Sequence, residues 1–283
     1  MFIKKFEIDT DKIKKRNEEL MAMNWIDKLT AKQKSFLNFR KGPPKFLMNK
    51  DGLYGFPDIS NYLVKPDVFS KISINSLEQY IITFDIKQKF EVIEFNLISA
   101  DLTKILQKIQ QMRIKNIQKY IKVEDSIFKK GIYANDTIYR VQDKAIEGNI
   151  IKNSTSWSLA PIEWFCGDSV CHLYITKIPK KIKVIYLENK SKDKNLKIFQ
   201  DFNIYEFEFI LPRNIEFKEL KTKTFKIPNR MFALKDEMKS KNKEQVFIIH
   251  YIKIIKRHTN IDFPVINNIE LTCPMTKSLS GKQ

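Results

Sequence analysis

The spacing of apolar residues changes near Gly131, and this change limits the folds open to the chain. Before it, Leu102, Leu106, Ile109 and Met112 recur at steps of three and four residues, which predicts a helix that begins near Ser99. After it come short runs rich in β-branched and aromatic residues. Strands are therefore expected at residues 137–142, 150–158, 172–178, 182–187, 205–211 and 246–255. Helices followed by strands favour an α+β fold over a doubly wound sheet.

The chain divides into three expected regions. Residues 1–50 form a basic and helical N-terminal extension, which ends at the helix-breaking sequence Gly42-Pro43-Pro44. Within it, residues 11–29 are compatible with a helix, either as a packed accessory element or as a surface that docks a partner. Residues 51–265 form the main domain, and residues 266–283 a loose C-terminal tail.

The formal net charge of +18 predicts attraction to anions such as nucleic acid, acidic protein surfaces or phosphorylated cofactors. The lysines are spread along the chain rather than clustered, which favours a compositional origin of this charge. No signal peptide is expected, because residues 1–11 contain no apolar run. No segment approaches 18 consecutive apolar residues, so no membrane-spanning helix is expected either.

The few cysteines and histidines give no clear metal site. Cys166, Cys171 and Cys273 are too few for a disulfide framework, which favours a reducing, intracellular compartment. The spacing of Cys166, Cys171 and His172 offers three ligands, but it matches no standard zinc motif, so buried structural roles are favoured. His250 has no companion residues in the sequence that suggest a site.

Three short motifs carry residues with chemical potential. Arg140, preceded by Tyr139, lies inside an expected strand, where its planar guanidinium suits a phosphate or a structural carboxylate partner. The sequence 154–156, Ser-Thr-Ser, lies in or beside the next strand, where hydroxyls orient a carboxylate or simply end the strand. Glu206 and Glu208 would share one face of a strand, as a reactive pair or as a solvated edge.

Taken in order, these motifs resemble the arginine–serine–glutamate family of mono-ADP-ribosyltransferases. That family includes the actin-modifying clostridial toxins and the arginine-specific vertebrate ectoenzymes. The resemblance covers roughly residues 55–255, and the continuation Leu211-Pro212-Arg213 after the glutamates adds to it. It implies an α+β fold with a helical N-terminal part, followed by two packed, mainly antiparallel β-sheets around an NAD cleft.

The resemblance also implies a role for each matched residue. Arg140, with Tyr139 beside it, would bind the phosphates of NAD, and Ser154 would support both the NAD site and the catalytic glutamate. Glu208 would be that catalytic glutamate, which stabilises the oxocarbenium-like centre as nicotinamide leaves. Glu206 would engage an acceptor arginine of a protein substrate. NAD is then a co-substrate, and the chemistry requires no metal.

The match has departures, and other functions stay open. Val141 follows the arginine where the family often has glycine. The segment 199–205 matches a loop that contacts the protein target in the family, and Trp157 and Phe165 are candidates to stack on nicotinamide. Such an enzyme would be a toxin or a viral effector, with the host cytoplasm as a possible place of action and an acidic or nucleic-acid-bound partner. The alternatives are a basic nucleic-acid-binding protein and an inactive scaffold with the same fold.

Overall fold

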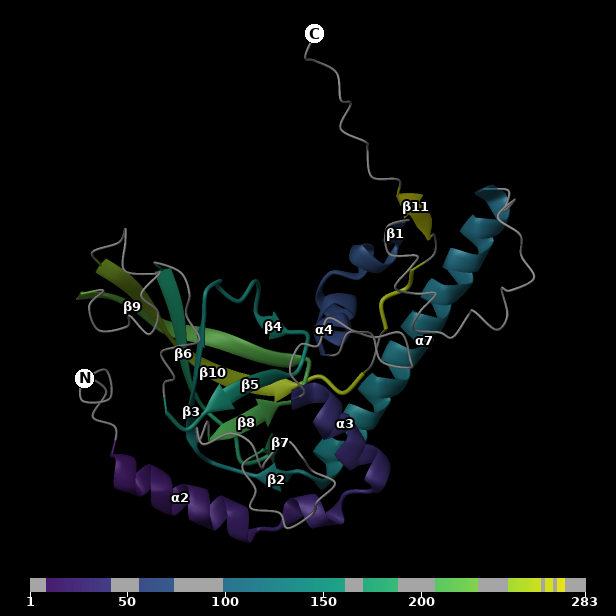
Figure 1. Cartoon of the computed structure of the whole chain (residues 1–283). Helices are drawn as coiled ribbons and strands as arrows, with labels where there is room; N and C mark the ends of the chain where they lie inside the picture. The colour runs from purple at the N-terminus through teal and green to yellow at the C-terminus, as the bar shows by residue number, and fades with distance from the viewer. Residues whose placement is uncertain are drawn as a thin grey trace. The chain divides into compact units, whose positions relative to one another are not determined.

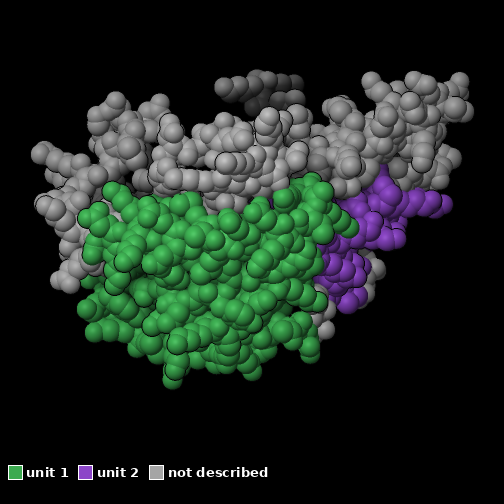
Figure 2. All heavy atoms as spheres, turned by 90° about the horizontal axis from the view of Figure 1, so that it is seen from below, with its two compact units in different colours: residues 1–35, 124–260 green, residues 36–123, 261–283 purple. Residues whose placement is uncertain are grey.

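The computed structural model describes most of the chain, and its residues cluster into two compact units (Figure 2). Unit 1 takes in residues 1–35 and 124–260, and unit 2 takes in residues 36–123 and 261–283. The described residues are 9–41, 56–73, 99–160, 170–187, 207–228, 244–260, 263–266 and 269–272. The domain boundaries expected at residues 50 and 265 stay predictions.

Unit 1 is built on a nine-stranded sheet with the strand order β2-β7-β8-β5-β3-β6-β10-β9-β4 (Figure 1). The strands are β2 (Ile132–Tyr133), β3 (Thr137–Gln142), β4 (Ile150–Ile151), β5 (Thr155–Ser158), β6 (Val170–Lys177), β7 (Lys183–Tyr186), β8 (Glu208–Leu211), β9 (Ile215–Pro228) and β10 (Glu244–Arg257). Among the described residues, its paired strands run antiparallel except β6 and β10, which are parallel. The α+β class is confirmed, although these strands are linked in one sheet rather than in the two packed sheets that were expected.

Two features of the sheet differ from the sequence prediction. The expected strand over residues 150–158 is two strands, because β4 pairs with β9 whereas β5 pairs with β3 and β8. The long strand β9 was missed, because its lysines hide the apolar alternation. Only its first two residues pair with β4, so most of β9 is an edge strand, where lysines discourage pairing with other chains.

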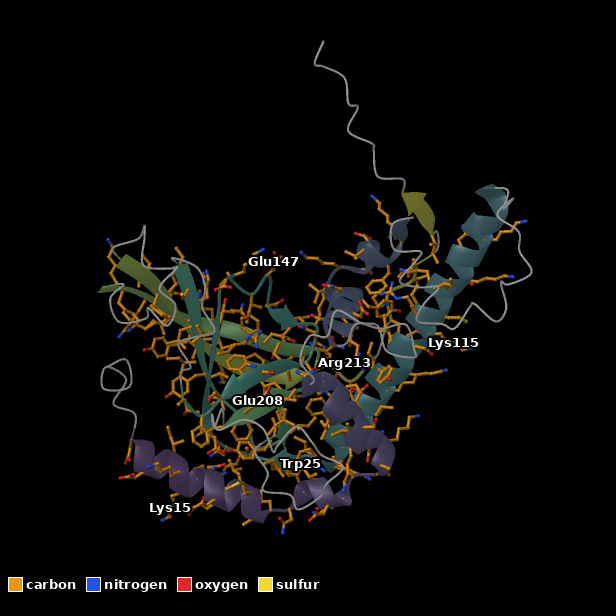
Figure 3. All side chains as sticks on the ribbon, viewed as in Figure 1. Lys15, Trp25, Lys115, Glu147, Glu208 and Arg213 are labelled. Carbon is orange, nitrogen blue, oxygen red and sulfur yellow. The ribbon has the colours of Figure 1, made fainter. Side chains whose placement is uncertain are left out.

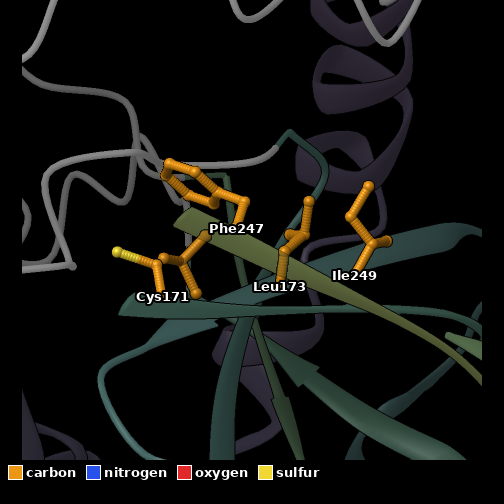
Figure 4. Close-up of a cluster of buried hydrophobic side chains, with 5 residues drawn as sticks. Cys171, Leu173, Phe247 and Ile249 are labelled. Atoms are coloured by element: carbon orange, nitrogen blue, oxygen red, sulfur yellow. The ribbon is translucent and has the colours of Figure 1, made fainter. Parts of the chain in front are cut away.

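The central strands bury an apolar cluster on one face of the sheet (Figure 4). Cys171 and Leu173 of β6 lie beside Phe247 and Ile249 of β10, and Val141 of β3 completes the set. The registers Cys171↔Phe247 and Leu173↔Ile249 place these side chains directly opposite one another. Each fully buried apolar side chain of this size stabilises the fold by about 1.5–3 kcal/mol.

The N-terminal segment of unit 1 is helical, as expected, but it contains more than one helix. Helix α2 (Thr10–Ala22) begins at Asp9, whose Oδ1 accepts hydrogen bonds from two backbone N–H groups at its start. The left-handed backbone of Asn24 (φ 45°) then separates α2 from the 3-10 helix η1 (Trp25–Lys28), and α3 (Ala31–Lys41) follows, of which residues 31–35 belong to unit 1. Trp25 Nε1 donates to the carbonyl of Tyr186 at 2.9 Å, which ties this segment to β7.

Unit 2 contains mainly helices. They are α4 (Phe56–Val64), the 3-10 helix η2 (Pro66–Phe69) and the first part of α7 (Ser99–Lys130), with a parallel pair formed by β1 (Lys71–Ser73) and β11 (Glu270–Thr272). Arg113 lies on the buried face of α7, where it pairs with Asp58 at 3.4 Å, whereas Met112 is exposed. No helix among the described residues is long and apolar enough to cross a membrane.

The end of α7 is joined to the sheet of unit 1 by an ion cluster. Asp125 Oδ1 accepts from Arg213 Nε at 3.1 Å and from Arg257 Nη2 at 2.8 Å, and Asp125 Oδ2 accepts from Arg213 Nη2. Arg213 is almost completely buried, and the Arg257 guanidinium also lies over the Phe128 ring. One carboxylate therefore holds the turn after β8 and the end of β10 against the helix.

Replacing Asp125 with alanine should lower the free energy of unfolding by about 3–5 kcal/mol, because it leaves two largely buried guanidinium groups without their shared carboxylate. Urea or guanidinium denaturation followed by far-UV circular dichroism measures the change. Asp11→Ala is the control, because its contact with Lys14 spans 4.0 Å at the surface and should contribute less than about 1 kcal/mol. Equal losses in the two variants would contradict the structural role given to Asp125.

Candidate active site

Three of the matched motifs lie on neighbouring strands, because β8, β5 and β3 are adjacent in the sheet. Tyr139 of β3 is directly opposite Ser158 of β5, and Ser158 is directly opposite Glu208 of β8. Residues that face each other across antiparallel strands project to the same side of the sheet. A tyrosine, a serine and a glutamate thus form one row across the three strands.

Arg140 follows Tyr139 and therefore projects to the other face of β3. Its Nε donates to Gln142 Oε1 and its Nη1 donates to the carbonyl of Ser156, both at 2.7 Å. The second bond directs the guanidinium toward β5. Both of these acceptors are neutral, so the two bonds orient the guanidinium without pairing its charge, and its predicted role in binding phosphate stays a prediction.

Ser154 is held by helix α7. Its hydroxyl donates to Glu124 Oε1 at 2.6 Å, and both side chains are only 1% exposed. The register pairs Thr155 with Leu211, which places Ser154 near the far end of β8 from Glu208. The predicted role of Ser154 in supporting NAD and the catalytic glutamate stays a prediction, and the contact that the structure gives it is an anchor to α7.

Glu208 begins β8, and Arg213 lies just beyond the other end of the strand (Figure 3). Glu208 is 9% exposed, so its carboxylate is positioned within the protein rather than solvated at an edge of the sheet. The preceding Phe207 has φ 47°, a left-handed backbone conformation that costs a bulky residue roughly 1–3 kcal/mol. A regular strand therefore does not extend through Phe207, and strand alternation no longer predicts which way Glu206 points. Glu206 itself lies outside the described residues.

Ser158 is the site residue that sequence reasoning missed. It is buried and directly opposite Glu208, whereas the matched Ser154 lies four residues earlier. Its hydroxyl accepts from the Ala160 N–H at 3.2 Å. The available signal was the serine at every second position, 154, 156 and 158, which places three hydroxyls on one side of an extended chain.

The other candidates from the sequence are placed as follows. Trp157 is 2% exposed and donates through Nε1 to Thr155 Oγ1 at 2.8 Å. Its ring therefore packs in the core and is not exposed for stacking on nicotinamide. Phe165 and the segment 199–205 lie outside the described residues. Burial, followed by the nearby Tyr251, raises the pKa of Tyr139, which therefore stays a neutral hydrogen-bonding group at physiological pH.

The cysteine and histidine expectations need correction at two residues. Cys171 is fully buried and disulfide-bonded, while Cys166 and Cys273 lie outside the described residues. This disulfide does not agree with the reducing compartment that the few cysteines favoured, and it leaves Cys171 unavailable as a thiolate ligand, while its burial fits the structural role expected for it. His250 does have companions, because its ring lies between His172 and Glu219. Within the described part of the chain, no group of three or more residues is arranged to hold a metal ion.

Solved structures similar to this chain are ADP-ribosyltransferases. Plx2a, an ADP-ribosyltransferase toxin from Paenibacillus larvae, is 14% identical, with a TM-score of 0.41 over 88% of this chain and 98% of its own. The Clostridium limosum C3 exoenzyme is 13% identical, with a TM-score of 0.42 over 88% and 95%. The Vis toxin from Vibrio splendidus, also an ADP-ribosyltransferase, is 12% identical, with a TM-score of 0.39 over 88% and 87%.

No protein-family model and no curated sequence matches the chain. At these identities and TM-scores, the structural likenesses are too distant to assign an activity. A function must therefore be argued from the residues of the chain itself.

Replacing Ser154 with alanine should lower the free energy of unfolding by about 1–3 kcal/mol, because the buried Glu124 carboxylate loses its hydroxyl donor. Ser158→Ala, four residues further along, is the matched comparison, and it should cost less, because the Ser158 hydroxyl accepts from a neutral backbone N–H at 3.2 Å whereas that of Ser154 donates to a carboxylate at 2.6 Å. Chemical denaturation of both variants measures the difference. An unchanged midpoint for Ser154→Ala would rule out the anchoring role.

Proposed function

We propose that the chain is a mono-ADP-ribosyltransferase that cleaves NAD and transfers ADP-ribose to an arginine of a protein substrate. The observation that carries the proposal is the register across β3, β5 and β8, which brings the segment of Arg140 beside Ser158 and Glu208. Three motifs that are far apart in sequence thereby converge on adjacent strands. The resemblance of these motifs to the arginine–serine–glutamate family then supplies the chemistry.

In the proposed reaction, the bond between nicotinamide nitrogen and C1′ of its ribose breaks, and the electron pair leaves with nicotinamide. Glu208 stabilises the positive charge that develops at C1′, which a buried carboxylate does more strongly than a solvated one. A guanidinium nitrogen of the acceptor arginine attacks C1′ and gives up its proton. Glu206 orients that guanidinium and receives the proton. Arg140 holds the diphosphate.

Arg140 and Glu208 lie on opposite faces of the sheet, because Glu208 is in the row of Tyr139 and Arg140 is the residue after Tyr139. Among the described residues, β3 and β5 pair only at Tyr139 and Ser158. An NAD molecule that contacts both side chains must therefore pass from one face of the sheet to the other, at the point where β3 and β5 no longer pair. NAD is elongated, with its diphosphate several bonds from the nicotinamide ribose, so separate contacts are compatible with its shape.

A basic nucleic-acid-binding protein is the alternative from another functional class. Its motivation is the net charge of +18. Salt-dependent binding to random DNA or RNA that persists without Glu208, in a protein that cleaves no NAD, would favour it. An inactive scaffold would show neither NAD cleavage nor transfer, although it would fold normally.

Glu208→Gln should reduce both NAD cleavage and transfer by about 10²–10³-fold, because the amide cannot stabilise the developing positive charge. Glu206→Gln should reduce transfer to arginine more than it reduces NAD hydrolysis. Incubation with labelled NAD and cell extracts, followed by mass spectrometry of arginine adducts, measures both activities. Glu18→Gln, at an exposed position of α2, is the control and should keep full activity. If the unaltered protein neither labels any protein, itself included, nor cleaves NAD, the proposal fails.

A further inference from the structure

A chain of titratable side chains crosses three neighbouring strands of unit 1. Glu219 of β9 contacts His250 of β10, with Oε2 and Nδ1 2.6 Å apart. His250 Nε2 lies 2.9 Å from His172 Nδ1 on β6. The two imidazole rings are stacked, with centroids 5.2 Å apart. Glu219 is about half exposed, whereas His250 is almost buried, so this series of side chains runs from the surface into the sheet.

The side chains of Glu219, His250 and His172 lie on the same face of the sheet as Arg140. Gln142 is directly opposite His172, and Arg140 is directly opposite Tyr174, which in turn is opposite His250. The Tyr174 and His250 rings are stacked at 4.4 Å. Arg140 and His172 are thus diagonal neighbours on adjacent strands, a relation that separates such residues by roughly 7–8 Å. Gln142, whose amide oxygen accepts from Arg140 Nε, lies next to both.

The hydrogen bonds limit the proton positions available to the two histidines. An ionised Glu219 only accepts, so His250 Nδ1 carries a proton and donates to it. A single proton then fits between His250 Nε2 and His172 Nδ1. When one more proton is added, the positive charge can rest on His250 beside Glu219 or on His172 beside Gln142. Moving the shared proton across 2.9 Å interconverts these two states.

The charged and titratable groups near this pair lie on several elements, with Arg140 on β3, Tyr174 on β6 and Glu219 on β9. The loop after β3 carries Asp143, Lys144 and Glu147. Its Ile146 N–H donates to the Tyr174 hydroxyl, which holds this loop near β6. Burial, and then the neighbouring His250, lowers the pKa of His172, which keeps its ring neutral at physiological pH without a ligand. The hydrogen bond from His250 is the largest cause that lowers the pKa of Glu219.

We propose that Glu219, His250 and His172 form a proton relay that places one additional positive charge beside Arg140 when a diphosphate binds to that face of the sheet. A ligand bound to Arg140 favours the state in which His172 is an imidazolium, because His172 is the histidine nearer to it. The proton comes from solvent or, through the hydrogen bond between the two rings, from His250. The inference rests on the proposed function for the identity of the ligand.

ADP-ribose is the probe that tests this relay, because its diphosphate keeps a constant charge between pH 5.5 and 8.0. Isothermal titration calorimetry in buffers of different ionisation enthalpy reports both affinity and proton uptake. In the unaltered protein, we expect affinity to rise as pH falls, by at most about tenfold per pH unit, with uptake of up to one proton per ligand. The sign follows from linkage, because the protonated pair binds the anion more tightly.

His172→Gln should remove both the pH dependence and the proton uptake, while ADP-ribose still binds through Arg140. His258→Gln is the matched control, because His258 also contacts a glutamate, Glu216, at 2.7 Å but lacks a second histidine. It should leave both properties unchanged. Ring ¹⁵N shifts in the unaltered protein give a second readout, in which ADP-ribose should move the His172 signals toward those of an imidazolium.

The possible results separate this inference from the proposed function. Binding that needs Arg140 but shows no pH dependence and no proton uptake overturns the relay alone, as does pH dependence that survives in His172→Gln. Relay-dependent binding of ADP-ribose without any NAD cleavage supports the relay and contradicts the proposed enzyme. If the unaltered protein binds no ADP-ribose at any pH, both the relay and the NAD site are overturned.

Discussion

The two adjacent acids near the end of α7 set the geometry on which the candidate site depends. Asp125 binds the arginines that follow β8 and end β10, while Glu124 accepts the hydroxyl of Ser154 just before β5. One helical turn therefore fixes β5 at its start and β8 at its end. Since these two strands are antiparallel, their other ends meet where Ser158 is opposite Glu208. The charge cluster thus holds the ends of β5 and β8 that lie away from Glu208, while the strand pairing itself places Glu208 opposite Ser158.

Local pattern predicted the elements whose apolar residues alternate or repeat clearly. The strand over Thr137–Gln142 was predicted from its β-branched and aromatic residues, and the long helix from Ser99 was predicted from apolar residues at steps of three and four. Strand β9 was missed because an edge strand tolerates lysine on both faces. The left-handed Phe207 was equally invisible, because a bulky residue adopts that conformation only when the surrounding fold imposes it.

Contacts between distant segments explain why the site itself was only partly predicted. Ser158 and Glu208 are 50 positions apart, and their pairing is set by the register of β5 and β8. His172 and His250 are 78 positions apart and meet because β6 and β10 run parallel with that register. A sequence that contains three isolated histidines offers no periodicity from which such a pair can be read. The order of the motifs in the sequence indicated the segments of β3, β5 and β8. Only the strand pairing in the structure shows that Ser158 lies opposite Glu208 and that His172 meets His250.

There is a physical reason for the proposed phosphate-binding arginine and the proposed catalytic glutamate to lie on opposite faces of the sheet. Two unit charges 4 Å apart attract by about 4 kcal/mol in the effective dielectric near a protein surface. A directly facing pair would hold each other, and NAD would have to break that pair before it could bind either one. Two hydrogen bonds of Arg140 go instead to a neutral amide and a carbonyl. Each of these acceptors is a weaker competitor than a carboxylate, so in the proposed site a diphosphate gains more by replacing one of them.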